Sequence, residues 1–236
     1  MKGAVTAFKI LTLSRRFDLS QLSSQQVSAA VLYFPLVGFF FGLVLVVLNR
    51  LLDPYLESEM LGTLLITVLA LLTGANHYEG LQNTFDMLSA NLGLGEPGER
   101  RGAFGVLAIV LVVLLKIQAL IVTGETRALG LLLTPMFARW SLIIFLYGSA
   151  SIAIGSARTL VINVRAWQLL LTTAVILSVA AFLIARTALW IGLCLSLFAL
   201  LGRSYLHWRN GYVSNDNAGA VIELSETLSF VLLASL

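Results

Sequence analysis

The chain has 236 residues, of which 58% are hydrophobic and 11% are charged, and its mean hydropathy is +0.93. Soluble domains usually carry about 25% charged residues, so this composition excludes an ordinary soluble protein. The formal charge is +3, but the basic residues lie mostly between apolar segments, where they orient a membrane protein, so nucleic acid is not expected as a partner.

Long apolar runs predict an all-α bundle of about seven transmembrane helices, because a bilayer core needs about 20 apolar residues per helix. In chain order the predicted spans are 29–52, 59–75, 103–123, 128–153, 167–185, 187–202 and 218–236. The fifth and sixth spans nearly touch, so they form either a tight hairpin or one long kinked helix. We expect a single transmembrane domain over residues 1–236, in contact with membrane lipid.

The Lys and Arg residues between the spans predict the orientation in the membrane. When successive loops are assigned to alternate sides, ten basic residues fall on one side and three on the other. The richer side holds Lys2, Lys9, Arg15, Arg16, Arg100, Arg101, Arg158, Arg165, Arg203 and Arg209, and the poorer side holds Arg50, Arg127 and Arg186. This bias predicts a cytoplasmic N-terminus and polar loops at 76–101 and 203–217 that face the cytoplasm.

A polar stretch, NHYEGLQNTFD at residues 76–86, interrupts the apolar sequence. If the second span continues as a helix into this stretch, the spacing of three, four and three puts Asn76, Glu79, Asn83 and Asp86 on one face. Carboxylates stacked on a helix repel one another unless a cation lies between them, and oxygen ligands of this kind suit Mg²⁺ or Mn²⁺. The alternative is a solvated amphipathic helix end at the membrane surface.

Further ionisable side chains accompany this stretch. His77 is either a base or metal ligand, or a hydrogen-bonded structural residue. In NGYVSNDNAGAVIELSE, residues 210–226, Asp216 precedes the last apolar span and Glu223 and Glu226 lie inside it. Ionisable residues inside a membrane helix are expensive and suggest function, and Asp216 and Glu223 share a face that could line one cavity. Alternatively, the glutamates pair with cations within the bundle.

The basic residues Lys116 and Arg139 fall within predicted spans and complement those glutamates. They either neutralise the glutamates or contact a substrate phosphate. The loop GEPGERRGAFG, residues 95–105, adds Arg100 and Arg101 directly after the polar helix. Guanidinium groups near carboxylates suit an anionic substrate that is held partly by arginine and partly by metal. Anchoring of the loop at the cytoplasmic surface explains these arginines equally well.

Five motifs in register resemble the cobalamin synthases, which are adenosylcobinamide-GDP ribazoletransferases. TGANHYEGLQNTFD at 73–86 is similar to the first family signature, approximately T-G-G-x-H-x-D-G-L-A-D-T-x-D. The 210–226 stretch is similar to a later signature, G-G-x-x-G-D-x-x-G-A-x-x-E-L-x-E. The other three motifs are YFPLVGFFFG at 33–42, RRGAFGVLAI at 100–109 and TPMFARW at 134–140. Each motif alone is weak, but their shared order covers nearly the whole chain.

The resemblance implies an inner-membrane transferase, late in cobamide assembly, that joins adenosylcobinamide-GDP to α-ribazole or its 5′-phosphate and releases GMP with Mg²⁺. The metal ligands would be Glu79, Asn83, Asp86 and Asp216, and the catalytic residues His77, Asp86 and Asp216. Substrate contacts are expected at Arg100, Arg101, Arg139, Lys116 and Glu223. The expected partners are corrinoid and nucleoside small molecules, with other cobamide-assembly enzymes and a second copy of this chain as further candidates.

The chain also departs from the family signatures. Where the family has three aspartates on the helix face, this chain has Glu79, Asn83 and Asp86. Met87 stands where the family has a glycine, and so does Asn215 in the later signature. Asn83 keeps an oxygen ligand but removes one negative charge, which weakens metal affinity, alters the substrate or marks a loss of catalysis.

Three alternatives stay open on the sequence alone. One is a different membrane phosphotransferase with another nucleotide-activated substrate, and another is a catalytically silent homologue that acts as a scaffold for cobamide assembly. The third is a small transporter, in which the intramembrane charges line a substrate path. Transporters of that kind often contain paired broken helices, for which Pro35 and Pro135 are the candidates here.

Overall fold

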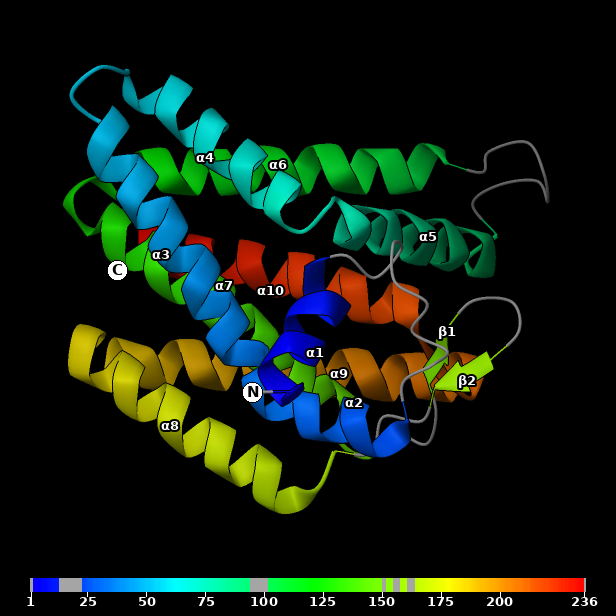
Figure 1. Ribbon diagram of the computed structural model, residues 1–236. Coiled ribbons are helices and arrows are strands. Elements are labelled where there is room, and N and C mark those ends of the chain that lie inside the picture. The colour runs from blue at the N-terminus through cyan, green and yellow to red at the C-terminus, as the bar shows by residue number, and fades with distance from the viewer. Residues whose placement is uncertain are drawn as a thin grey trace.

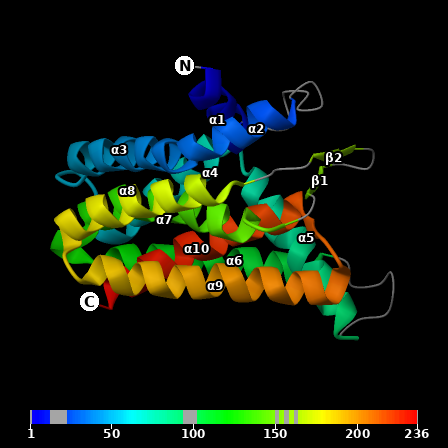
Figure 2. The ribbon, with the colours of Figure 1, turned by 90° about the horizontal axis from the view of Figure 1, so that it is seen from below.

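A computed structural model describes residues 2–12, 23–93, 102–149, 152–154, 158–160 and 164–235 (Figure 1). Long helices form most of this part of the chain and lie side by side in one bundle (Figures 1 and 2). The α-helices are α1 (Lys2–Thr12), α2 (Ser24–Ala30), α3 (Phe34–Leu52), α4 (Ser58–Leu72), α5 (Asn76–Asn91), α6 (Ala103–Val122), α7 (Arg127–Leu146), α8 (Ala166–Ile184), α9 (Thr187–Asn210) and α10 (Asn215–Ala234). Two 3₁₀ turns are η2 (Val31–Tyr33) and η3 (Gly124–Thr126). The predicted all-α fold is confirmed.

Six helical segments of the described chain are long and apolar enough to cross a membrane. They are Gln25–Leu52, which joins α2, η2 and α3, and the helices α6, α7, α8, α9 and α10. A seventh crossing results if α4 and α5, which meet at a bend of 90°, count as one broken span. The prediction of a multi-pass membrane protein with about seven spans is therefore confirmed.

The second predicted span breaks before the polar stretch, so the condition that it continues as one helix into that stretch is not met. α4 ends at Leu72, and Gly74 and Ala75 adopt φ values of +63° and +56° before α5 begins at Asn76. Glycine takes this left-handed conformation at little cost, whereas alanine rarely does, so the turn depends on Gly74 and on the packing around Ala75. The expected polar face survives because α5 is itself helical from its first residue.

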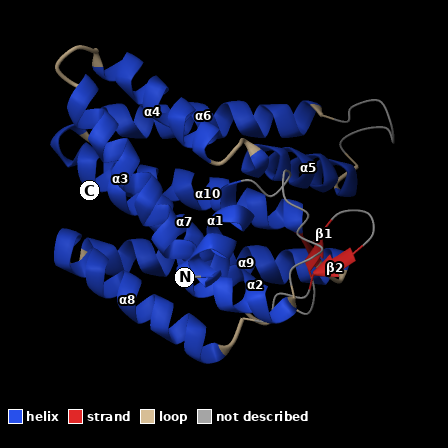
Figure 3. Cartoon of the chain, in the orientation of Figure 1, coloured by secondary structure: helices blue, strands red, loops and turns tan. Residues whose placement is uncertain are grey.

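The fourth predicted span, 128–153, is too long at its C-terminal end. α7 stops at Leu146, and residues 152–154 form β1 (Ile152–Ile154) of a small sheet, which is red in Figure 3. β1 pairs antiparallel with β2 (Arg158–Leu160) and parallel with β3 (Val213–Ser214). Strands of two or three residues are too short to produce a detectable alternating pattern, so the sequence did not predict them.

The fifth and sixth predicted spans are two separate helices. α8 and α9 are distinct spans on either side of Ala185, which has a φ of +49°, so the hairpin alternative is confirmed. α9 continues to Asn210, eight residues beyond the predicted end at residue 202. This extension carries basic and aromatic side chains beyond the apolar part of the helix.

α7 and α10 form the centre of the bundle. Of the apolar window in each helix, 89% is buried in α7 and 67% in α10, against 22% in α8. α3 approaches α7 closely at Gly38, where an added Cβ would lie 2.2 Å from the Pro135 carbonyl oxygen. The peripheral helices α6, α8 and α9 expose apolar side chains, which is the surface that lipid would cover.

Candidate functional site

α5 packs across the first turns of α10 at one end of the bundle (Figure 1). Two glycines bring the backbones together. A Cβ on Gly80 would lie 2.6 Å from the Asp216 carbonyl oxygen, and a Cβ on Gly219 would lie 3.3 Å from the Gly80 Cα. Because the backbones touch at this crossing, the side chains that flank it are held in a fixed arrangement.

Two hydrogen bonds join the polar motifs across the crossing. Asn83 Nδ2 donates to Asp216 Oδ2 over 3.2 Å at an exposed position, and Asn217 Nδ2 donates to Thr84 Oγ1 over 3.1 Å in the interior. Ser214 Oγ accepts the backbone N–H of Asn217 and so caps α10. The prediction that the two motifs lie adjacent at one end of the bundle is confirmed.

Asp86 links α5 to the start of α6. Its Oδ1 accepts the backbone N–H of Gly105 over 2.8 Å, within the first turn of α6. The first N–H groups of a helix lack partners inside the helix, and the helix dipole favours a carboxylate there. Asp86 therefore has a structural contact through one carboxylate oxygen, and Oδ2 is the atom that a metal could use.

A small cavity of about 60 Å³ lies beside the crossing, and Asn76, His77 and Asp216 line it together with Leu11 of α1. Asn76 Nδ2 donates to the Thr12 carbonyl oxygen over 3.2 Å, and His77 forms a hydrogen bond with the backbone of Leu11. Within the described residues, His77 Nε2 is buried without a hydrogen-bond partner. Such an atom is costly unless water or a ligand reaches it, so His77 is suited to contact a bound molecule.

A sealed ion cluster, formed by Lys116, Arg139, Glu223 and Glu226, lies deeper in the bundle. Lys116 Nζ lies 2.5 Å from Glu223 Oε2 and 2.6 Å from Glu226 Oε2, and Arg139 donates to Glu226 Oε1. All four side chains are at most 2% exposed. Their two positive and two negative charges balance, which is how buried charges are normally tolerated.

The sealed ion cluster bears out the alternative in which the glutamates pair with cations inside the bundle. Glu223 is seven residues beyond Asp216 on α10, about 10 Å along the axis, and it is absent from the described lining of the Asp216 cavity. Among the described residues, Glu223 therefore does not line the Asp216 cavity, contrary to what the shared helix face suggested. The structure does not test the direct substrate contacts that the sequence predicted for Lys116, Arg139 and Glu223, and Arg100 and Arg101 lie outside the described residues.

Some contacts at the site involve residues that the sequence analysis did not identify. Tyr78 forms a hydrogen bond with Glu223, and Lys116 Nζ lies 5.6 Å from the centre of the Tyr78 ring. Thr84 lies one turn after Gly80, on the face that meets α10, and this spacing is the signal that could have identified it. The end of α1 was also not expected to wall the cavity, because its sequence carries no polar motif.

The oxygen donors at the crossing suit a metal that keeps water and substrate ligands. Among the described residues, no group of three or more His, Cys, Asp and Glu side chains is placed to hold a metal ion. Mg²⁺ is usually bound by one or two carboxylates, with waters and substrate phosphates completing its shell. Glu79, Asp216 and the amide oxygen of Asn83, if the amide rotates, provide such a partial set, so the donors fit Mg²⁺ with a phosphate substrate.

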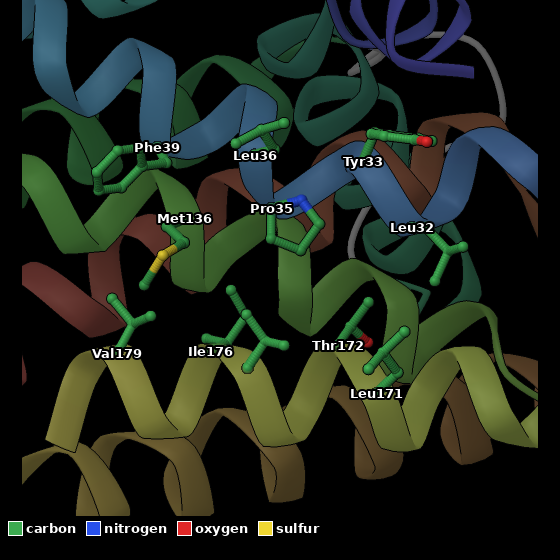
Figure 4. A pocket seen from close by; sticks show the side chains of 11 residues that line it. Leu32, Tyr33, Pro35, Leu36, Phe39, Met136, Leu171, Thr172, Ile176 and Val179 are labelled. Carbon is green, nitrogen blue, oxygen red and sulfur yellow. The ribbon is translucent and has the colours of Figure 1, made fainter. Parts of the chain in front are cut away.

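A larger pocket of about 490 Å³ lies between α3, α7 and α8 (Figure 4). Its lining is almost entirely apolar, with Phe39, Met136 and Ile176 among the side chains that point into it (Figure 4). Leu36 and Leu171 at its rim belong to the exposed apolar surface of the bundle. The pocket lacks the charged groups that phosphate chemistry needs, so the cavity at the α5–α10 crossing is the better candidate site.

Residues 3–234 match the family model described as cobalamin-5-phosphate synthase. The chain belongs to this family. The predicted resemblance to the cobalamin synthases is therefore confirmed over almost the full length of the chain.

Relatives of this family member are named adenosylcobinamide-GDP ribazoletransferase. The chain is 32% identical to the one from Geotalea daltonii, over 90% of this chain and 88% of the relative. It is 31% identical to the one from Thermoanaerobacter pseudethanolicus, over 86% of this chain and 85% of the relative. A Pseudomonas fluorescens relative is 32% identical over 89% of each chain. No solved structure matches the chain.

Proposed function

We propose that this protein is an adenosylcobinamide-GDP ribazoletransferase, which joins adenosylcobinamide-GDP to α-ribazole or its 5′-phosphate and releases GMP. Membership of the family and the names of the relatives support this activity. The observation that carries the proposal is the contact between Asn83 and Asp216, which joins the two polar motifs at an exposed position. Asn83 is exposed and Asp216 is partly exposed, so a substrate can reach this pair.

The reaction moves one phosphoryl group. A ribazole hydroxyl oxygen bonds to the corrinoid-linked phosphorus, the bond from that phosphorus to the GMP oxygen breaks, and the hydroxyl proton passes to a base. Catalysis of such transfers depends mainly on positioning and on stabilising charge. Asp216 is the candidate base because its carboxylate is partly exposed beside the cavity. His77, which is buried and held by α1, is better placed to orient the substrate.

The residues that would hold Mg²⁺ are Glu79, Asn83 and Asp216, with Asp86 Oδ2 as a further oxygen. Bound there, the metal would neutralise phosphate charge and favour departure of GMP. Asn83 supplies a neutral oxygen where the family has a carboxylate, so weaker metal binding is expected than in relatives with three aspartates. Arg100 and Arg101, which follow α5 in the sequence, would contact the phosphates.

The site would face the cytoplasm from the inner membrane. The α5–α10 crossing lies at the same end of the bundle as the C-terminal end of α9, since Arg209 donates to the Asn91 carbonyl oxygen over 2.8 Å. Arg127 lies at the other end, beside Asp53 and Ser58. The excess of basic residues at the α5 end supports a cytoplasmic orientation of that end.

The test is a direct assay of the purified protein in detergent. Adenosylcobinamide-GDP, α-ribazole and Mg²⁺ are added, and GMP and the corrinoid product are measured by chromatography. GMP formation that requires both substrates and stops with a chelator is expected. A folded protein that forms no GMP would favour the scaffold alternative, and GMP formation from a different nucleotide-activated substrate would favour a related phosphotransferase.

A further inference from the structure

The exposed side chains of α9 mark the level of the membrane. A continuous apolar and aromatic stripe faces outward along the helix and consists of Trp190, Leu193, Leu197, Leu201, Tyr205 and Trp208. Trp190 and Trp208 are eighteen residues apart, which corresponds to about 27 Å of helix. This is close to the hydrocarbon thickness of about 30 Å, and tryptophan and tyrosine prefer the two membrane interfaces. The last two turns of α9 therefore lie at the level of the lipid headgroups.

A polar cleft of about 330 Å³ lies at this level, between the end of α7 and the last two turns of α9. It is lined by Gly148, Ser149, Arg203, Ser204, His207 and Trp208. Arg203, one of the lining residues, donates to the Tyr147 carbonyl oxygen, so its guanidinium lies beside the end of α7. Gly148 has a φ of +77°, and a Cβ there would lie 3.2 Å from a terminal nitrogen of Arg203. Glycine thus leaves room for the guanidinium.

The cleft has the chemistry of a phosphate site. Arg203 offers a permanent positive charge with several N–H donors, and Ser204 and His207 add donors one residue and one turn further along the helix. None of the six described lining residues is acidic. The apolar stripe reaches the cleft at Trp208, which belongs to both, so a ligand with a phosphate and a long apolar tail complements the surface.

We propose that this cleft binds the headgroup phosphate of an anionic phospholipid, whose acyl chains lie along the exposed stripe of α9. The lipid would hold the end of α7 against α9, next to the short connection that leads into α10 and Asp216. Lipid binding would follow from the position of the cleft at the headgroup level and from its positive charge, whether or not the protein has transferase activity.

The experiment measures lipid retention by native mass spectrometry of the full-length protein in detergent. Dioleoyl phosphatidylglycerol is compared with dioleoyl phosphatidylcholine, and inorganic phosphate is added as a competitor. Preferential retention of phosphatidylglycerol is expected, with affinity about fivefold weaker in Arg203→Gln and in Ser204→Asp. Arg186→Gln, at the other end of α9, and Ser204→Asn, which adds no charge, should bind like the wild type.

Each other outcome overturns the proposal. Equal retention of the two lipids would show that the site does not select an anionic headgroup. Unchanged phosphatidylglycerol binding in both Arg203→Gln and Ser204→Asp would place the lipid elsewhere. Because Ser204 is exposed, the Ser204→Asp variant should fold even if Arg203→Gln does not. Displacement of the lipid by millimolar inorganic phosphate would assign the cleft to a free phosphate compound instead.

Discussion

Two polar clusters lie along α10, and they differ in their access to solvent. At the α5–α10 crossing, Asn83 is exposed and Asp216 is partly exposed, and both are placed beside further oxygen donors. Two turns deeper, the sealed ion cluster excludes solvent and pairs each carboxylate with a cation. The comparison shows that charge within a span does not identify a binding site by itself. Donors that solvent and substrate can reach do so better.

The largest effect is expected from breaking the sealed ion cluster. Lys116→Met removes the cation that both glutamates contact, and an uncompensated buried charge typically costs about 3–5 kcal/mol. The variant should therefore lose much of its thermal stability in detergent, as measured by the temperature at which it aggregates. Lys116→Met combined with Glu223→Gln keeps the charges balanced through Arg139 and Glu226, so it should recover most of that loss. Equal stability of the single and double variants would contradict an electrostatic role.

The next effect concerns the contact that positions the open site. Gly80→Ala would place a Cβ against the Asp216 backbone and push α5 away from α10, and overpacking of this kind costs about 1–3 kcal/mol. GMP formation should fall together with the melting temperature. Gly62→Ala is the matched control, because the nearest atom to an added Cβ there is 3.8 Å away. If both alanine variants behave alike, the close crossing does not position the site.

An effect of similar size, on metal affinity instead of stability, is expected at the open site itself. Asn83→Asp restores a carboxylate about 4 Å from a bound cation, which is worth roughly 1 to 4 kcal/mol and thus about tenfold or more in affinity. Without metal, the new carboxylate would face that of Asp216 and destabilise the protein slightly. Titration with Mn²⁺, followed by electron paramagnetic resonance, measures the change. As a control, Ser235→Asp adds the same charge at the far end of α10 and should leave Mn²⁺ affinity unchanged. Equal Mn²⁺ affinities in the wild type, Asn83→Asp and Ser235→Asp would exclude this metal site.

The smallest effect separates the two roles of Asp86. Asp86→Ala removes the acceptor for the Gly105 N–H and should cost about 1 kcal/mol of stability, the usual value for a lost helix cap. Asp86→Asn keeps an acceptor oxygen and should preserve most of that stability, so a loss of Mn²⁺ binding in this variant would reveal metal contact through Oδ2. If Asp86→Asn binds Mn²⁺ like the wild type, Asp86 acts through its contact with α6 alone.

Much of the fold was predictable because apolar runs determine where helices can cross a membrane. The polar face of α5 was also predictable from helical spacing, and the family signatures indicated that this face meets Asp216. The bend before α5 could not be predicted, because Ala75 adopts a positive φ that alanine rarely adopts. The sequence also could not decide whether Lys116 contacts substrate or a glutamate. Both alternatives need the same residue types and differ only in side-chain packing.

The most direct test of the account compares GMP formation by one variant from each cluster. Asp216→Asn changes the open site without altering its size, and the charge-balanced Lys116→Met, Glu223→Gln variant changes the sealed ion cluster. With both proteins shown to be folded, single-turnover assays with adenosylcobinamide-GDP, α-ribazole and Mg²⁺ measure the rate of GMP release. The account predicts that Asp216→Asn slows release by about 100-fold or more, as expected for loss of a catalytic base, while the double variant stays within about fivefold of wild type. Normal GMP release by Asp216→Asn, together with its loss in the double variant, would contradict the assignment and place the reaction in the sealed cluster.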